Sequence, residues 1–101
     1  MDPTPLKAKV AIVSGSDSGI GAQIARDLSL AGAHVVVNYP FPTATLVERA
    51  NALVSSLPTP GLAVEADLST TAGPQTLIDA TVAKFGKIDI LINNAGLAIN
   101  L

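Results

Sequence analysis

The 101-residue sequence contains no cysteine and a single histidine, His34. Without cysteine the chain can form no disulfide, no thiolate zinc site and no cysteine nucleophile, and one histidine does not make a metal cluster. Basic residues are also few, at six against eight acidic ones, and they form no run or tail. Because binding to nucleic acid requires clustered Lys and Arg, this distribution argues against a nucleic-acid partner.

Long apolar runs are missing as well. No stretch reaches the roughly 18 consecutive apolar residues of a membrane-spanning helix. The N-terminal segment "MDPTPLKAKV" lacks the basic region followed by a long apolar region that marks a signal peptide. We therefore expect no membrane partner and a cytoplasmic location.

Charged residues make up only 14% of the chain, whereas 49% of it is hydrophobic. A soluble domain normally carries about 25% charged residues, and a small one should be more polar still because it has much surface for its volume. Although 101 residues are enough for one domain, this composition suits the interior of a larger domain better than a complete small one.

The hydrophobic pattern alternates between short β-branched runs, such as "KVAIVS" and "HVVVN", and longer stretches with apolar residues at helical spacing. Continuous runs of this length are typical of strands buried on both faces. The pattern predicts strands at 9–14, 34–38, 61–67 and 88–93, and helices at 19–31, 43–57 and 77–85. The segment "LSTTAGPQ" at 68–75 is a loop and a possible helix start. Regular alternation of strand and helix indicates one α/β domain, with helices covering the faces of a parallel sheet.

Three glycines lie in the segment "SGSDSGIG", between the first predicted strand and the first predicted helix. Such a turn points free backbone N–H groups and the positive end of the helix dipole at one place, which suits an anion. The spacing G-x-x-x-G-x-G is neither the dinucleotide fingerprint G-x-G-x-x-G nor a P-loop. The residues alone therefore predict a phosphate-bearing ligand, with a tight turn that binds nothing as the alternative.

Together with "NNAG" at 93–96, this loop resembles the classical short-chain dehydrogenase/reductase family. The family motif T-G-x-x-x-G-I-G stands here as "SGSDSGIG", and "EADLS" ends the third predicted strand with the aspartate usual in the family, Asp67. The resemblance extends from about Lys7 to Gly96. It implies a Rossmann-type parallel sheet with strand order 3-2-1-4, and a chain, residues 1–101, that is the N-terminal NAD(P)-binding portion of one Rossmann domain.

The resemblance also assigns residues to an NAD or NADP site. Those expected to line the pyrophosphate are Gly15, Gly19, Ile20 and Gly21. Those expected to flank the adenine are Asp67, whose carboxylate would accept from the adenine amino group, and Leu68. Those expected to border the adenine ribose and the nicotinamide side are Asn94, Ala95 and Gly96. Alternatives remain in which Asp67 is a cap or turn residue and Asn93 and Asn94 are turn formers only.

The choice of dinucleotide depends on the end of the second predicted strand, where a carboxylate would bind the ribose 2′-hydroxyl and repel a 2′-phosphate. Asn38 stands there instead. Ser18 occupies a position where many NADP-dependent relatives carry a basic residue. Tyr39, Thr43 and Thr45 offer hydrogen-bond donors nearby but no cation. We predict NADP in preference to NAD, with Ser18, Asn38 and Tyr39 among the cofactor-binding residues.

Two residues of the glycine segment depart from the family motif. Ser14 replaces the usual threonine but keeps the hydroxyl group. Asp17 places a carboxylate in the phosphate loop, where it would oppose the charge of a pyrophosphate. We expect the Asp17 side chain to point to solvent.

The catalytic residues of the family, a serine and a Y-x-x-x-K pair, have no counterpart in these 101 residues. The single tyrosine, Tyr39, is followed four residues later by Thr43. We expect the chain to stop before the catalytic segment and to be inactive alone. In a full-length form, hydride would pass between NADPH and a small carbonyl compound or secondary alcohol. The fourth predicted strand would form an exposed apolar edge, which predicts self-association and poor solubility.

Two other functions compete with this interpretation. The chain could be a non-enzymatic dinucleotide-binding or subunit-interaction module that works as it stands. A phosphate-binding regulatory domain of the flavodoxin-like kind is a weaker alternative, because it leaves "NNAG" without a role.

Overall fold

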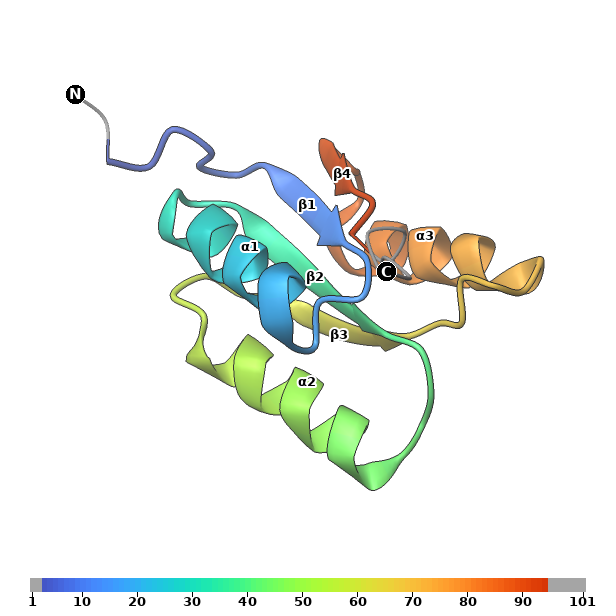
Figure 1. Cartoon of the computed structure of the whole chain (residues 1–101). Helices are drawn as coiled ribbons and strands as arrows, with labels where there is room; N and C mark the ends of the chain where they lie inside the picture. Colours follow the sequence, from blue (N-terminus) through green and yellow to red (C-terminus); the bar gives the residue numbers. More distant parts are fainter. Residues whose placement is uncertain (1–2, 95–101) are drawn as a thin grey trace.

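The computed structural model of the chain describes residues 3–94, and Ala95 and Gly96 of the "NNAG" segment lie outside these residues. Strands and helices alternate along the chain in the predicted order (Figure 1). The elements are β1 (Val10–Val13), α1 (Gly19–Leu30), β2 (His34–Tyr39), α2 (Ala44–Ser56), β3 (Leu62–Glu65), α3 (Ala72–Phe85) and β4 (Ile90–Ile92).

The four strands form one parallel sheet in the order β3-β2-β1-β4. In the middle of the sheet, Ala11 of β1 pairs with Val35 of β2 and with Ile90 of β4. On the far side of β2, Val36 pairs with Leu62 of β3. The predicted α/β class and the parallel strand order 3-2-1-4 are therefore confirmed.

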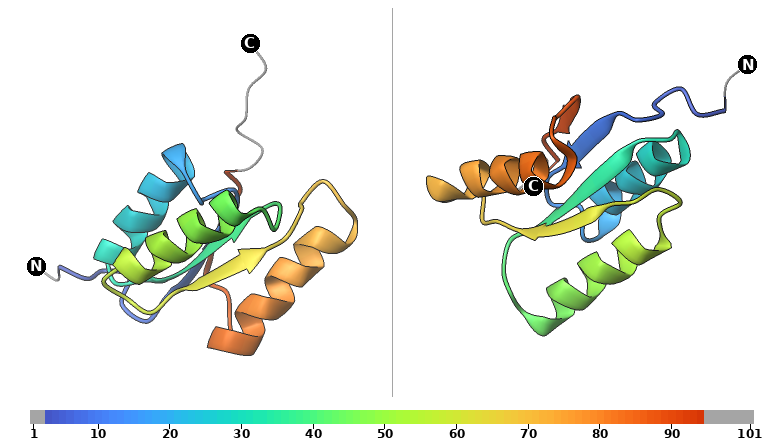
Figure 2. Two further views of the ribbon diagram at one scale, coloured as in Figure 1. Left: turned by 90° about the horizontal axis from the view of Figure 1, so that it is seen from below. Right: turned by 180° about the vertical axis from the view of Figure 1, so that it is seen from behind.

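The two faces of the sheet are covered by different helices, with α1 and α2 on one face and α3 on the other (Figure 2). Because successive side chains of a strand point to opposite faces, Val13 and Val35 belong to the core beneath α1 and α2. Ile12 and Val36 belong to the core beneath α3, where they join Leu77. Burial on both faces explains why β1 and β2 appear in the sequence as continuous apolar runs.

The helices agree with the predicted ones, and α3 begins at Ala72, within the segment 68–75 that the sequence indicates as a loop or a possible helix start. Pro74 lies in the first turn, where its missing N–H removes no helical hydrogen bond. The Thr70 hydroxyl accepts a hydrogen bond from the N–H of Gly73 at 3.1 Å. Thr43 takes the N-cap position of α2, as predicted. No helix within residues 3–94 is long and apolar enough to cross a membrane.

Strand β4 lies at one edge of the four-stranded sheet, as expected, and is paired with β1. Leu91 of β4 is 63% exposed, and Ile78 and Val82 of the neighbouring helix α3 are also exposed. These three side chains give the edge an apolar character. Self-association through this edge stays a prediction.

Candidate functional site

The loops that follow β1, β2 and β3 meet at the carboxyl edge of the sheet. Residues from all three line a cavity of about 370 Å³: Gly15, Asn38, Pro40, Phe41, Ala66, Asp67, Leu68 and Ser69. In open α/β sheets, ligands bind beyond the carboxyl ends of the strands, where the connections diverge to opposite sides. In this sheet that point lies at β1. Its neighbour β2 is followed by α2 on one face, and its other neighbour β4 is preceded by α3 on the opposite face.

The glycine loop leaves β1 with two residues in the left-handed region, Gly15 at φ 58° and Gly19 at φ 62°. A side chain at Gly19 would meet no atom within 4 Å, so the space beside it is open. The N–H groups of Gly19, Ile20 and Gly21 belong to the first turn of α1, which has no helical acceptors for them. In the described part of the chain no other group accepts from these three. This end of α1 is therefore free to hold an anion.

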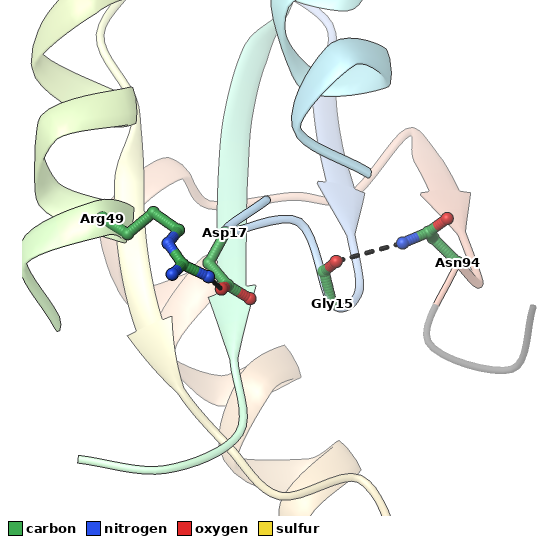
Figure 3. A network of polar contacts seen from close by, with 4 residues as sticks. All are labelled: Gly15, Asp17, Arg49 and Asn94. Atoms are coloured by element: carbon green, nitrogen blue, oxygen red, sulfur yellow. Dashed lines mark hydrogen bonds and ion pairs between the residues drawn. The ribbon is translucent and has the colours of Figure 1, made fainter. Parts of the chain in front are cut away.

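Gly21 differs from Gly19 because it is buried and packed against the end of β4. A Cβ atom at Gly21 would lie 2.5 Å from Nδ2 of Asn94 and 2.6 Å from the carbonyl oxygen of Gly15. The absence of a side chain at Gly21 is what lets Nδ2 of Asn94 donate to the carbonyl of Gly15 at 3.0 Å (Figure 3). The two sequence motifs are therefore joined by a hydrogen bond, and Asn94 does more than form a turn.

Asn38 lies beneath the glycine loop, with only 2% of its surface exposed. Its Oδ1 accepts from the N–H of Gly15 at 2.9 Å, and its Nδ2 donates to the carbonyls of Val64 at 3.2 Å and Ala66 at 3.1 Å. The amide thus connects the loop to β3, a role that the sequence motifs do not indicate. A contact between Asn38 and a cofactor stays a prediction.

Ser16 fastens the same loop to the end of β2. Its N–H donates to the carbonyl of Asn38 at 2.9 Å, and its hydroxyl accepts from the N–H of Asn38 at 3.1 Å. The hydroxyl also donates to the carbonyl of Val13 at 2.6 Å. Of the other predicted residues here, Ser18 is exposed, whereas Tyr39 is buried in the core beneath α1 and α2.

Asp67 begins a tight turn at one side of the cavity. Its Oδ1 accepts from the hydroxyl of Ser69 at 2.7 Å and from the N–H of Ser69 at 3.0 Å. These bonds hold the pKa of Asp67 below its usual value of 3.8, and the bond from the Ser69 hydroxyl has the larger effect. The carboxylate is therefore charged at neutral pH. The turn engages one carboxylate oxygen, so forming a turn does not prevent Asp67 from accepting a ligand hydrogen bond.

Asp17 does not point to solvent, so that prediction is wrong. The residue is 8% exposed, and its Oδ2 lies 3.5 Å from Nη1 of Arg49 on α2 (Figure 3). Arg49 was missed because it lies 32 residues from Asp17 in the sequence. A local signal existed: Arg49 precedes the buried Ala50 on α2, so it lies beside the face that packs on the sheet.

A second, smaller cavity of about 250 Å³ lies between α3 and strands β1 and β4. Its lining is mostly apolar and includes two of the exposed side chains at the β4 edge, Ile78 and Leu91. The lining residues are Ile12, Ser14, Leu68, Pro74, Leu77, Ile78, Leu91 and Asn93. Leu68 contributes to both cavities. The predicted residues that the structure describes are therefore brought to one edge of the sheet.

Comparison with known proteins identifies a family. Residues 9–101 match the short chain dehydrogenase family. An uncharacterized oxidoreductase of Methylorubrum extorquens is 43% identical over 94 residues, which cover 90% of this chain and 36% of that protein. The 2-dehydro-3-deoxy-D-gluconate 5-dehydrogenase of Escherichia coli is 43% identical over 93 residues, which cover 91% of this chain and 35% of that protein.

Solved structures give the same result for the fold. A dehydrogenase/reductase from Sinorhizobium meliloti superposes with a TM-score of 0.82 at 36% identity, covering 91% of this chain and 36% of the other. A 7α-hydroxysteroid dehydrogenase, in complex with NADH and 7-oxo glycochenodeoxycholic acid, superposes with a TM-score of 0.77 at 33% identity. That match covers 89% of this chain and 34% of the other. The chain thus spans little more than a third of the length of these relatives.

Proposed function

The chain belongs to the short-chain dehydrogenase family, and on that premise we propose that it forms the NAD(P)-binding part of an oxidoreductase that prefers NADP. The observation that carries this proposal is the junction of the two motifs at the carboxyl edge of the sheet. There Asn94 holds the carbonyl of Gly15 at 3.0 Å, next to a first helical turn whose N–H groups are free of protein partners in the described residues.

The residues present fit a dinucleotide. Open space beside Gly19 and the N–H groups of Gly19, Ile20 and Gly21 suit an anionic pyrophosphate. The cavity next to them has room for an adenosine group and is lined by Asp67 and Leu68.

In this account each part of the site has a separate task. The first turn of α1 holds the pyrophosphate, and the charged Asp67 carboxylate accepts a hydrogen bond from the adenine amino group. Asn38 and Asn94 keep the loop in place by occupying the N–H and the carbonyl of Gly15. When bound, the nicotinamide ring supplies or accepts the hydride.

The preference for NADP is supported by the end of β2. A carboxylate at that position would bind a ribose 2′-hydroxyl and exclude a 2′-phosphate, but Asn38 and Tyr39 stand there and both are buried. Because one relative was solved with NADH, family membership alone does not decide the cofactor. The preference has to come from residues of this chain.

For a whole protein, we propose hydride transfer between NADPH and a carbonyl compound or secondary alcohol. The 101 residues contain no Y-x-x-x-K pair, because Tyr39 is followed by Thr43 at the fourth position. We therefore propose that this chain binds the cofactor but does not turn over a substrate by itself. A non-enzymatic dinucleotide-binding or subunit-interaction module remains the alternative function, and a cytoplasmic location stays a prediction.

Two measurements on the purified 101-residue chain test this proposal. Calorimetric titration should show saturable binding of NADP, with weaker binding of NAD. Incubation with NADPH and a panel of ketones and aldehydes should give no oxidation of NADPH above the rate without protein. Failure to bind either dinucleotide would refute the proposed function, and turnover by the chain would refute the predicted inactivity.

A further inference from the structure

A carboxylate and a cation meet at the glycine loop, although the segments 14–21 and 38–45 contain no basic residue. Asp17 directly follows Ser16, which is fastened to the backbone of Asn38 by two hydrogen bonds. Asp17 therefore lies beside the carboxyl end of β2, although it belongs to the loop after β1. Arg49 reaches the same place from α2 and lies 3.5 Å from the Asp17 carboxylate.

The two partners of this ion pair are not equally covered. The side chain of Asp17 is 9% exposed, whereas that of Arg49 is 45% exposed. Nη1 of Arg49 binds Asp17, whereas Nη2 and Nε of Arg49 make no hydrogen bond within residues 3–94. A guanidinium has five N–H donors in a planar fork, so most of them remain available to a second anion.

The other ion pair in the described part of the chain lies elsewhere. Lys87 pairs with Asp89, and Asp89 binds the N–H of Val10, at the start of β1. That pair is therefore at the amino edge of the sheet. Among the described ion pairs, Arg49 with Asp17 is the one at the cofactor edge.

We propose that Arg49 binds the 2′-phosphate of NADP and so sets the dinucleotide preference, with Asp17 holding its guanidinium in place; this rests on the function proposed above. In Rossmann folds an arginine near the end of the second strand accommodates the 2′-phosphate. Here α2 supplies it, and the loop carboxylate orients it. Pairing with Arg49 also offsets the charge of Asp17, which would otherwise repel a 2′-phosphate beside it.

The test compares Kd values for NADP and NAD, measured by calorimetry on the full 101-residue chain. Arg49→Met should weaken NADP binding by about ten- to hundredfold, the range expected for a lost hydrogen bond to a charged group, and should change NAD binding by less than about threefold. Arg26→Met, an exposed arginine of α1, is the matched control and should leave both Kd values unchanged. Circular dichroism and a thermal melt establish that each variant is folded.

A double variant separates direct binding from mere neutralisation of Asp17. If Arg49 binds the 2′-phosphate, Asp17→Asn combined with Arg49→Met should keep the low NADP preference of Arg49→Met. If Arg49 only offsets the Asp17 charge, the double variant would recover the preference and overturn the proposal. Adenosine 2′,5′-bisphosphate and adenosine 5′-monophosphate, which differ only in the 2′-phosphate, should show the same pattern.

The remaining outcomes are distinct. Equal losses for NADP and NAD in Arg49→Met, or no loss of either, would overturn this inference and leave the proposed function standing. If the unmodified chain binds neither dinucleotide, the proposed function fails and this inference fails with it.

Discussion

Asn38 of β2 and Asn94, which follows β4, bind different groups of Gly15. Asn38 accepts from its N–H, and Asn94 donates to its carbonyl. The shape of the glycine loop is therefore fixed by side chains as well as by the glycines themselves. Two side chains of the same residue type thus perform complementary tasks because an amide carries both a donor and an acceptor.

Replacing Asn38 should destabilise the fold. Asn38→Ala leaves the N–H of Gly15 and the carbonyls of Val64 and Ala66 without their side-chain partner, so the free energy of unfolding should fall by about 2–4 kcal/mol. Urea unfolding monitored by circular dichroism measures this change. Asn51→Ala, on the exposed face of α2, is the control, and equal losses for the two variants would contradict the role given to Asn38.

Two glycines with positive φ angles allow the effect of a substitution on cofactor binding to be separated from its effect on stability. Gly19 and Gly86 have φ values of 62° and 81°, and a Cβ atom would meet nothing within 4 Å at either. Gly19→Ala and Gly86→Ala should each lower the free energy of unfolding by about 1–2 kcal/mol. Only Gly19→Ala should also weaken NADP binding, by about tenfold or more, because its methyl group occupies the approach to the loop.

Urea unfolding measures the free energy of unfolding of both glycine variants, and calorimetry measures their affinity for NADP. Similar NADP affinities for the two variants would show that the open space beside Gly19 is not the approach of the cofactor.

Asp89 makes the stability of the fold depend on pH. Its Oδ2 accepts from the N–H of Val10 at 2.8 Å and from Lys87 at 3.0 Å. These contacts hold the pKa of Asp89 below its usual value of 3.8, and the bond from the Val10 N–H has the largest effect. Its stabilising contribution is complete above the unfolded pKa and is lost as the pH falls through the lower folded pKa.

Asp89→Asn should therefore lower stability at pH 7 and flatten the decline of stability between about pH 5 and pH 2. Thermal melts over this pH range measure the effect. Asp27→Asn, on the exposed side of α1, removes the same charge elsewhere. If the two variants give curves of the same shape, the acid sensitivity does not come from Asp89.

At the scale of elements, β1 and β2 could be predicted because their β-branched runs are buried on both faces, as at Val10–Val13. The two outer strands, β3 and β4, are only partly buried, but they too could be predicted from short apolar runs between the helices. The start of α3 could be placed only within "LSTTAGPQ", because "TTAGPQ" is rich in residues that favour turns. Only the packed structure shows that Thr70 bonds to Gly73 and that Pro74 fits the first turn. A local pattern therefore predicts an element better than it predicts the boundary of that element.

The edge strand β4 should drive self-association. Leu91→Lys places a charge on the strand where Leu91 is 63% exposed, and charged side chains on an edge oppose pairing with another sheet. The unmodified chain should show a mass that rises with concentration in sedimentation equilibrium, and Leu91→Lys should reduce that rise. Leu30→Lys, at an equally exposed position on α1, should not. A monomeric unmodified chain at high concentration would contradict this prediction.

For the molecule as a whole, the family and the strand order could be predicted from two motifs and the alternation of elements. The Asp17–Arg49 pair and the bonds from Asn38 to β3 could not. The residues of the ion pair are 32 positions apart in the sequence, and those joined by the Asn38 bonds are 26 and 28 positions apart. Whether they meet depends on how α2 and β3 pack on β2. Motifs thus predict where a site lies, whereas the pairing of charges within the site can be seen only in the tertiary structure.

The low charge content also has an explanation at this scale. The chain spans 36% of a relative with which it shares 43% identity, and exposed apolar side chains line the β4 edge and α3. In a longer polypeptide of this family, further residues would cover that surface. Such coverage would account for the low charge content, and that the chain is part of a larger sheet domain stays a prediction.

The most direct test of the central claim is a titration of the ¹⁵N-labelled chain with NADP, followed by two-dimensional NMR. We predict saturable shifts of the backbone amide signals of Gly15, Gly19, Ile20 and Gly21, joined by those of Asp67 and Leu68. Signals from the amino edge of the sheet, such as that of Asp89, should stay in place. Unchanged spectra, or shifts confined to residues away from the glycine loop, would contradict the assignment of this loop as the dinucleotide site.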